Sequence, residues 1–215
     1  MIFFDIETAP LMASEMNERL PEFKARANLK DEAKIEADIK DKREKFFDEA
    51  ALSPFTGRVC AYGYAAAEDK KVTLVHYNGR ENGEKAILIK FWNLYIKSED
   101  SFVGFNINSF DLPFLIRRSY VHDITMPNDV YNPVYRRYGK RFIDMMDYWR
   151  LTNHQERISL SNFAIHVGLK PKEESGKFFH QWIKGDEDDV KKAEDYLTND
   201  VELTRSVYQR IGLAA

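Results

Sequence analysis

The sequence predicts an α/β domain built around a mixed sheet. Strand candidates come first along the chain and then alternate with amphipathic helices, an order that is typical of α/β proteins. Of the 215 residues, 44% are hydrophobic and 13% are aromatic, which is enough for a sizeable core. The length favours a single domain over residues 1–215.

Short apolar runs mark the expected strands, and apolar residues three or four positions apart mark the expected helices. The strands are expected over residues 2–6, 58–66, 71–77, 101–105 and 141–146. The helices are expected over residues 84–96, 111–120, 161–167 and 188–211. The first strand is expected to end at Thr8-Ala9-Pro10 because proline cannot donate to a sheet ladder.

A charged segment, at about residues 11–52, interrupts this order directly after the first strand. Its apolar residues Ile35, Ile39 and Phe46 form a helical stripe, and Pro21 separates a short helix from a longer one. Mixed acidic and basic residues fill the opposite face. We interpret the segment as a solvated amphipathic helical insertion.

The net charge of -3 and the pI near 6.0 disfavour a tight, nonspecific duplex binder, because counterion release needs clustered Lys and Arg. They do not exclude an enzyme that grips a few phosphates through metal ions. The single cysteine, Cys60, excludes an internal disulfide and suits a reducing compartment. Without an apolar run of signal or membrane length, the expected location is cytoplasmic, with no membrane partner.

Acidic residues fall in three short motifs. Asp5 and Glu7 lie two apart on an expected strand, so both carboxylates point the same way, and such oxygen ligands suit Mg²⁺ or Mn²⁺. Asp111 opens an expected helix after a polar loop, where helix capping is the simpler interpretation. Tyr196 and Asp200 lie four apart and share one helix face. Taken singly, each motif is a weak indication.

Together and in this order, the motifs resemble those of the DEDDy 3′→5′ exonucleases. Residues 4–8, Phe-Asp-Ile-Glu-Thr, are similar to the first motif of that family, Asn106 with Phe110-Asp111 to the second, and Tyr196 with Asp200 to the third. A histidine five residues before the last acid would indicate the DEDDh branch, but Asp195 stands there. The resemblance covers residues 1–4 and roughly 54–211, without the charged segment. It implies that close relatives are the proofreading exonuclease domains of family B DNA polymerases and their free-standing predicted homologues.

The resemblance implies an RNase H-like fold, in which helices flank a central mixed five-stranded sheet. The helical insertion that the charged segment predicts after the first strand lies outside the resemblance. It implies two divalent metal ions, Mg²⁺ or Mn²⁺, with Asp5, Glu7, Asp111 and Asp200 as ligands and Tyr196 orienting the attacking water. The expected activity is 3′→5′ hydrolysis of single-stranded DNA, in DNA repair or in proofreading for a polymerase.

Further contacts to the substrate are expected from Thr8, Asn106, Ile107 and Phe110. Ile107 and Phe110 can stack on or wedge beside the terminal base, with core packing as an equal alternative. The basic run at residues 135–141 can track a backbone or be a surface loop. Two alternative functions stay open: a ribonuclease D-like exoribonuclease, and a catalytically silent member that binds nucleic acid or docks on a polymerase or another replication or repair protein.

Overall fold

The computed structural model describes residues 1–76, 83–131, 141–153, 155–172 and 176–212. The chain forms two compact units. The first, here called the sheet unit, comprises Met1–Glu7 and Val59–Ala215. The second, the arm unit, is Thr8–Arg58 and contains the whole charged segment.

Five strands form one sheet in the order β3-β2-β1-β4-β5. Their bounds are β1 Ile2–Pro10, β2 Gly57–Ala66, β3 Thr73–His76, β4 Phe102–Gly104 and β5 Phe142–Asp144. β1 is the central strand. It runs parallel to β4, and β4 runs parallel to β5, whereas β2 and β3 are antiparallel. The predicted mixed five-stranded sheet is therefore confirmed.

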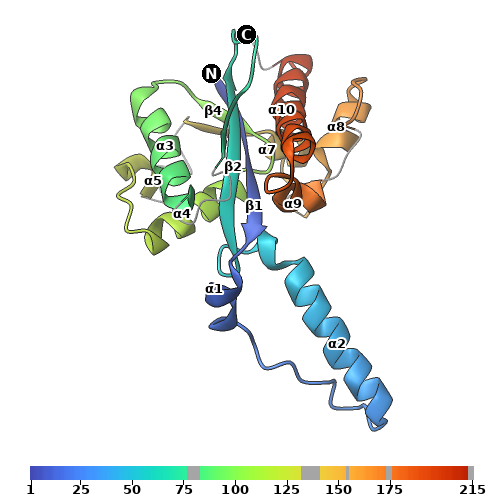
Figure 1. Cartoon of the computed structure of the whole chain (residues 1–215). Coiled ribbons are helices and arrows are strands. Elements are labelled where there is room, and N and C mark those ends of the chain that lie inside the picture. The colour runs from blue at the N-terminus through green and yellow to red at the C-terminus, as the bar shows by residue number, and fades with distance from the viewer. Residues whose placement is uncertain (77–82, 132–140, 154, 173–175, 213–215) are drawn as a thin grey trace. The chain divides into compact units, whose positions relative to one another are not determined.

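Helices cover both faces of this sheet, as the α/β prediction requires. On one side lie α3 (Gly83–Lys97) and α4 (Asp111–Val121), and on the other lie α8 (Leu160–His166), α9 (Phe179–Trp182) and α10 (Glu187–Arg210) (Figure 1). The shorter elements of the sheet unit are α5 (Asn128–Tyr131), α7 (Met145–Arg150) and the 3-10 turn η2 (Gly176–Phe178). No helix in the described part of the chain combines the length and the apolar composition that crossing a membrane requires.

The central strand is buried on both faces, and its alternating side chains pack against both helical layers. Phe4 is fully buried and lies 5.4 Å, between ring centroids, from Phe91 of α3. On the opposite face, Phe3 meets Tyr208 of α10 at 5.4 Å. Since side chains two positions apart share a face, Asp5 and Glu7 point to the same side as Phe3, toward α10.

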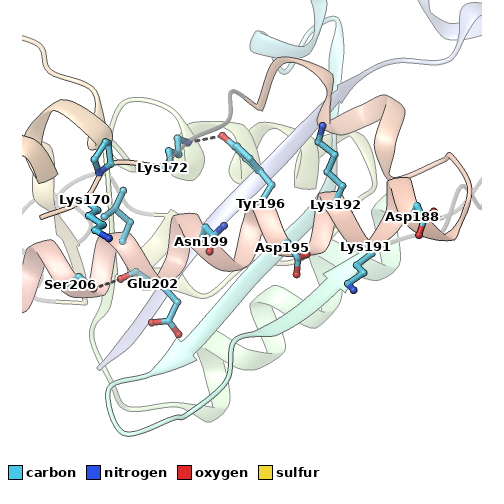
Figure 2. Close-up of a pocket in the computed structure, with 12 residues that line it drawn as sticks. Lys170, Lys172, Asp188, Lys191, Lys192, Asp195, Tyr196, Asn199, Glu202 and Ser206 are labelled. Atoms are coloured by element: carbon cyan, nitrogen blue, oxygen red, sulfur yellow. Dashed lines mark hydrogen bonds between the residues drawn. The ribbon is translucent and has the colours of Figure 1, made fainter.

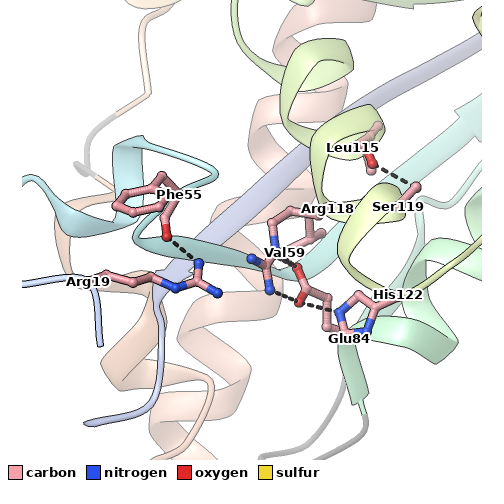
Figure 3. Close-up of polar contacts among 8 residues, drawn as sticks. All are labelled: Arg19, Phe55, Val59, Glu84, Leu115, Arg118, Ser119 and His122. Carbon is pink, nitrogen blue, oxygen red and sulfur yellow. Dashed lines mark hydrogen bonds and ion pairs between the residues drawn. The ribbon is translucent and has the colours of Figure 1, made fainter. Parts of the chain in front are cut away.

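A buried ion pair between Glu84 and Arg118 joins α3 to α4 on the side of the sheet that these helices cover (Figure 3). Glu84 accepts hydrogen bonds from Arg118 Nε at 2.9 Å and Nη2 at 2.7 Å, and from the Val59 N–H at 2.8 Å. His122 Nε2 lies 2.7 Å from the same carboxylate. Burial alone would raise the pKa of Glu84, but the hydrogen bonds from His122 and Arg118 outweigh it, and the pKa lies below its ordinary value.

The arm unit has a small core of its own. Its helices are α1 (Ala13–Asn17), α2 (Glu32–Asp48) and the 3-10 turn η1 (Ala50–Leu52), so the predicted short and long helices are both present. Leu11, Met16 and Ala50 are buried together, with Phe46 of the predicted stripe packed against them. The side chain of Asp31 caps α2 by accepting from the Lys34 N–H at 3.1 Å. Elsewhere in this unit, Arg19 donates to the carbonyl of Phe55 (Figure 3).

Two strand ends near the site differ from the sequence prediction. β1 continues to Pro10, beyond the predicted range of residues 2–6. β5 ends at Asp144, because that side chain accepts from the Met146 N–H at 2.9 Å and starts α7. Helix α9 was not predicted. Most of the basic run, residues 135–140, lies outside the described residues, while Arg141 donates to the carbonyls of Tyr95 and Ser98.

Candidate active site

Three carboxylates from two distant segments meet between β1 and α10. Asp5 and Glu7 extend from the α10 side of β1, and Asp200 lies on the buried stripe of α10. One oxygen from each carboxylate lies within 4.8 Å of the other two. The two-residue period of the strand places Asp5 and Glu7 side by side on one face. Asp200 joins them because α10 packs against that face.

Asp111 lies beside this cluster at the start of α4, which follows β4 after the loop of residues 105–110. It is 3% exposed, and its Oδ1 accepts from the backbone N–H of Ile6 at 3.3 Å. Burial raises the pKa of Asp111 to about 7, against the lowering effect of that hydrogen bond. Asp111 is an acid in the first turn of α4 but not its N-cap, which is Phe110, and its carboxylate also contacts the central strand between Asp5 and Glu7.

The acids raise one another's pKa. For Asp5, burial is the largest cause and repulsion from Asp111 and Asp200 follows, so its pKa lies well above the ordinary value. Burial and repulsion from Asp200 do the same for Glu7. Such a group of carboxylates binds protons or cations that offset the repulsion between its members.

Lys172 contacts two residues of the candidate site and was not predicted from the sequence. Its Nζ donates to Asp200 Oδ2 at 2.7 Å. It also donates to the hydroxyl of Tyr196 at 2.6 Å, as Figure 2 shows. The ammonium lowers the pKa of Asp200, although burial, the larger effect, leaves that pKa raised. Lys172 lies in the segment after α8 and belongs to no recognisable motif. Only its contacts with Tyr196 and Asp200 of α10 identify it.

Tyr196 is held among aromatic and charged neighbours. The ring is 7% exposed and lies 6.2 Å from the ring of Phe179 and 6.1 Å from that of Trp182. Burial, followed by the charge of Asp200, raises the pKa of the phenol, so Tyr196 keeps its proton at neutral pH. It also lines a pocket of about 630 Å³ along α10, together with Lys172, Lys192 and Asn199 (Figure 2).

The donor set fits divalent metal ions. Asp5, Glu7 and Asp200 offer only oxygen atoms, the ligands that Mg²⁺ and Mn²⁺ prefer, and Asp111 is close by. Asp200 Oδ1 is buried and has no hydrogen-bond partner within the described ranges. A buried carboxylate oxygen of this kind costs free energy unless a cation or a donor reaches it.

The loop between β4 and α4 is held in place by Asp144 at the end of β5. Its carboxylate accepts from the N–H groups of Asn106 at 2.7 Å and Asn108 at 2.9 Å. Asn106 has a φ of 61°, and its side-chain Oδ1 is buried without a partner among the described residues. Asp144 therefore fixes the loop that leads to Asp111.

The residues expected to contact substrate have different surroundings. Ile107 is fully buried and packs against Gly104, so in this conformation it is a packing residue. Phe110 is half-buried, with its ring 5.5 Å from that of Phe114. Thr8 belongs to the arm unit. The substrate contacts of these residues and of Asn106 stay predictions.

Residues 52–215 match the sequence model of a family described as a predicted 3′-5′ exonuclease related to the exonuclease domain of PolB. This match covers well over half of the chain, and the chain therefore belongs to that family. The kinship that the motifs indicated is confirmed. Asp5 and Glu7 precede the matched residues, so the structure provides the evidence that they join Asp200.

The fold is similar to that of a solved family B DNA polymerase from the hyperthermophilic archaeon Pyrobaculum calidifontis. The TM-score is 0.64 and the sequence identity is 15%, and the superposition covers 98% of this chain. The same superposition covers 24% of the polymerase chain, so this protein spans about a quarter of its length. No match is found among curated proteins.

Proposed function

We propose that this protein is a divalent-metal-dependent 3′→5′ exonuclease that acts on single-stranded DNA. The observation that carries the proposal is the meeting of Asp5, Glu7 and Asp200 within 4.8 Å, beside Asp111 and Tyr196. Membership of a PolB-related exonuclease family supports the reaction class. The family match begins at residue 52 and therefore does not include Asp5 and Glu7. For these two residues the proposal depends on their position beside Asp200.

Each residue of the site has a distinct task in this proposal. Asp5, Glu7, Asp200 and Asp111 would hold two ions, Mg²⁺ or Mn²⁺. When bound, such ions provide an acidified water and neutralise charge on the phosphate. Because these residues offer only oxygen ligands, they favour hard cations such as Mg²⁺ and Mn²⁺ over softer metal ions.

Tyr196 would orient the attacking water. In this proposal the phenol acts as a hydrogen-bond partner of the water and not as a metal ligand. Lys172 holds the phenol and Asp200 in one arrangement through its two hydrogen bonds. This preorganisation reduces the reorganisation needed when a substrate enters.

The experiment is degradation of oligonucleotides labelled at the 3′ or the 5′ end, as DNA and as RNA, with Mg²⁺, with Mn²⁺ and with chelator. The expected result is loss of single nucleotides from the 3′ end of DNA, only with metal. Asp200→Asn should abolish it, since a neutral amide is a poor ligand. The matched control is Asp195→Asn, an exposed acid on the same helix.

Three outcomes contradict parts of the proposal. Faster degradation of RNA would favour the ribonuclease D-like alternative. Binding without degradation would favour a catalytically silent member of the family. Full activity of folded Asp200→Asn would show that the site lies elsewhere.

A further inference from the structure

We propose that Gly176 is a positioning residue of the active site. Because it has no side chain, its backbone packs directly against the Tyr196 hydroxyl and fixes the position of that group. The inference rests on the proposed function, because it assigns Gly176 to the same reaction. Gly176 opens the 3-10 turn η2, which precedes α9, and belongs to no exonuclease motif.

The distances around Gly176 leave no room for a side chain. A Cβ at this position would lie 2.7 Å from Tyr196 Oη, 3.0 Å from Cζ and 3.1 Å from Cε1. Favourable separation between non-bonded carbon atoms begins at about 3.5 Å. All three contacts fall at the hydroxyl end of the ring, which is the end that the reaction would use.

Space, and not backbone conformation, requires glycine here. The glycines with positive φ are Gly168 and Gly212 among the described residues, so alanine could adopt the backbone angles of Gly176. Replacing Gly176 by alanine would therefore act through the tyrosine. Either the ring or the turn would have to shift.

The ring has little freedom to give way on its other sides. Phe179, 1% exposed, and Trp182 contact the ring, and Lys172 Nζ lies 4.6 Å from its centroid. Lys172 also fixes the hydroxyl through its 2.6 Å hydrogen bond. An added methyl group would push the hydroxyl away from Lys172 and from the water that it orients.

The first test is the steady-state kinetics of Gly176→Ala. A displacement of about 1 Å at a reacting group can cost about 10²-fold, so kcat should fall by up to that factor. KM should change little, because the metal ligands and substrate contacts remain. The matched control is Gly185→Ala, which crowds the side chain of Asp189 and does not touch Tyr196. It should keep the wild-type kcat, whatever it does to thermal stability.

The second test combines Gly176→Ala with Tyr196→Phe. Once the hydroxyl is absent, the alanine should cause no further loss of kcat, and its cost in melting temperature should be smaller than in the wild-type background. Additive effects on kcat would overturn the proposal. So would an unchanged kcat in folded Gly176→Ala. If Gly176→Ala fails to fold, the double variant should fold and have the kcat of Tyr196→Phe. Failure of both variants to fold would overturn the proposal.

These outcomes separate the inference from the proposed function. An inactive wild-type protein would contradict the exonuclease proposal, while the melting temperatures would still report whether the alanine conflicts with the hydroxyl. An active wild type with an insensitive Gly176→Ala would contradict the positioning role alone.

Discussion

Lys172 forms an ion pair with Asp200, with Nζ 2.7 Å from Oδ2. The lysine side chain is 22% exposed and that of the acid 6%, so solvent screens the pair only in part. The same ammonium donates to Tyr196, the other residue of the third motif. One cation therefore joins both members of that motif and offsets part of the repulsion among the acids.

Lys172→Gln should destabilise the protein in chelator by about 1.5–3 kcal/mol, the contribution of a hydrogen bond to a charged group. The loss should be smaller with excess Mn²⁺, because the metal supplies the positive charge. Melting curves of wild type and variant under both conditions provide the measurement. Lys191→Gln, an exposed lysine of the same pocket, is the control. Equal losses for both variants would contradict the role of Lys172.

Without metal, the stability of the fold should decrease as pH rises toward about 7, the pKa of Asp111. The pKa values of Asp5 and Glu7 lie above their ordinary values of 3.8 and 4.5, so the folded state holds protons that the unfolded state has released. The free energy of unfolding then falls across this window. Melting temperatures between pH 5 and pH 7 in chelator measure the effect.

Asp5→Asn should flatten this pH dependence, since it removes one of the repelling charges. Excess Mn²⁺ at pH 7 should recover stability, because a ligand that binds only the folded state stabilises it. A rise of the melting temperature with pH in chelator would contradict the acidic cluster.

Tyr196→Phe should slow the chemical step by about 10²-fold, in the range of a lost acid–base or positioning group. The rise in melting temperature with Mn²⁺ should remain, because the phenol is not a metal ligand in the proposal. Single-turnover rates provide the measurement. Tyr208→Phe removes a hydroxyl from a buried tyrosine on the same helix and should leave the rate unchanged. Equal rates for wild type and Tyr196→Phe would exclude the orienting role.

The parts of the site that the sequence could predict depend on local geometry. Asp5 and Glu7 share a strand face, and Tyr196 and Asp200 share a helix face, so spacing alone predicts which side chains go together. Asp111 could be assigned to the site only through the family resemblance, because an acid at a helix start is equally consistent with capping.

The parts that could not be predicted depend on contacts between distant segments. Lys172 and Gly176 lie against Tyr196 although both are at least 20 positions away in the sequence, and no periodicity encodes these contacts. The same holds for Asp144, whose carboxylate binds a loop 38 residues earlier in the chain. The boundary of β5 was missed because the side chain of Asp144 ends the strand by capping the next helix.

Glu84→Gln should destabilise the protein by about 3–5 kcal/mol, the cost of breaking a buried ion pair by neutralising one partner. Arg118 is 1% exposed, so its guanidinium would keep its charge in a low-dielectric site. Chemical denaturation measures the loss. Glu84→Gln combined with Arg118→Met should recover part of it, and kcat should be unchanged in both. A loss below 1 kcal/mol, or a variant with altered kcat, would contradict a purely stabilising role.

The last prediction concerns the arm unit. It has its own small core of Leu11, Met16 and Ala50, and the Leu11 N–H donates to the Thr56 carbonyl at 2.9 Å, so the two ends of the segment lie close together. A short linker can therefore bridge them, and closing such a loop costs little entropy. Replacing residues 12–50 with a short Gly/Ser linker should leave the sheet unit folded.

The shortened protein should still cleave short single strands, because none of the five proposed catalytic residues lies in the arm unit. Affinity for longer strands should change, since the unit begins at Thr8, directly after Glu7 in the chain. Cleavage of a short and a long labelled oligonucleotide by both forms provides the measurement, and circular dichroism checks folding. If the shortened protein unfolds or loses activity on the short strand, residues 12–50 are part of the catalytic fold and not an insertion.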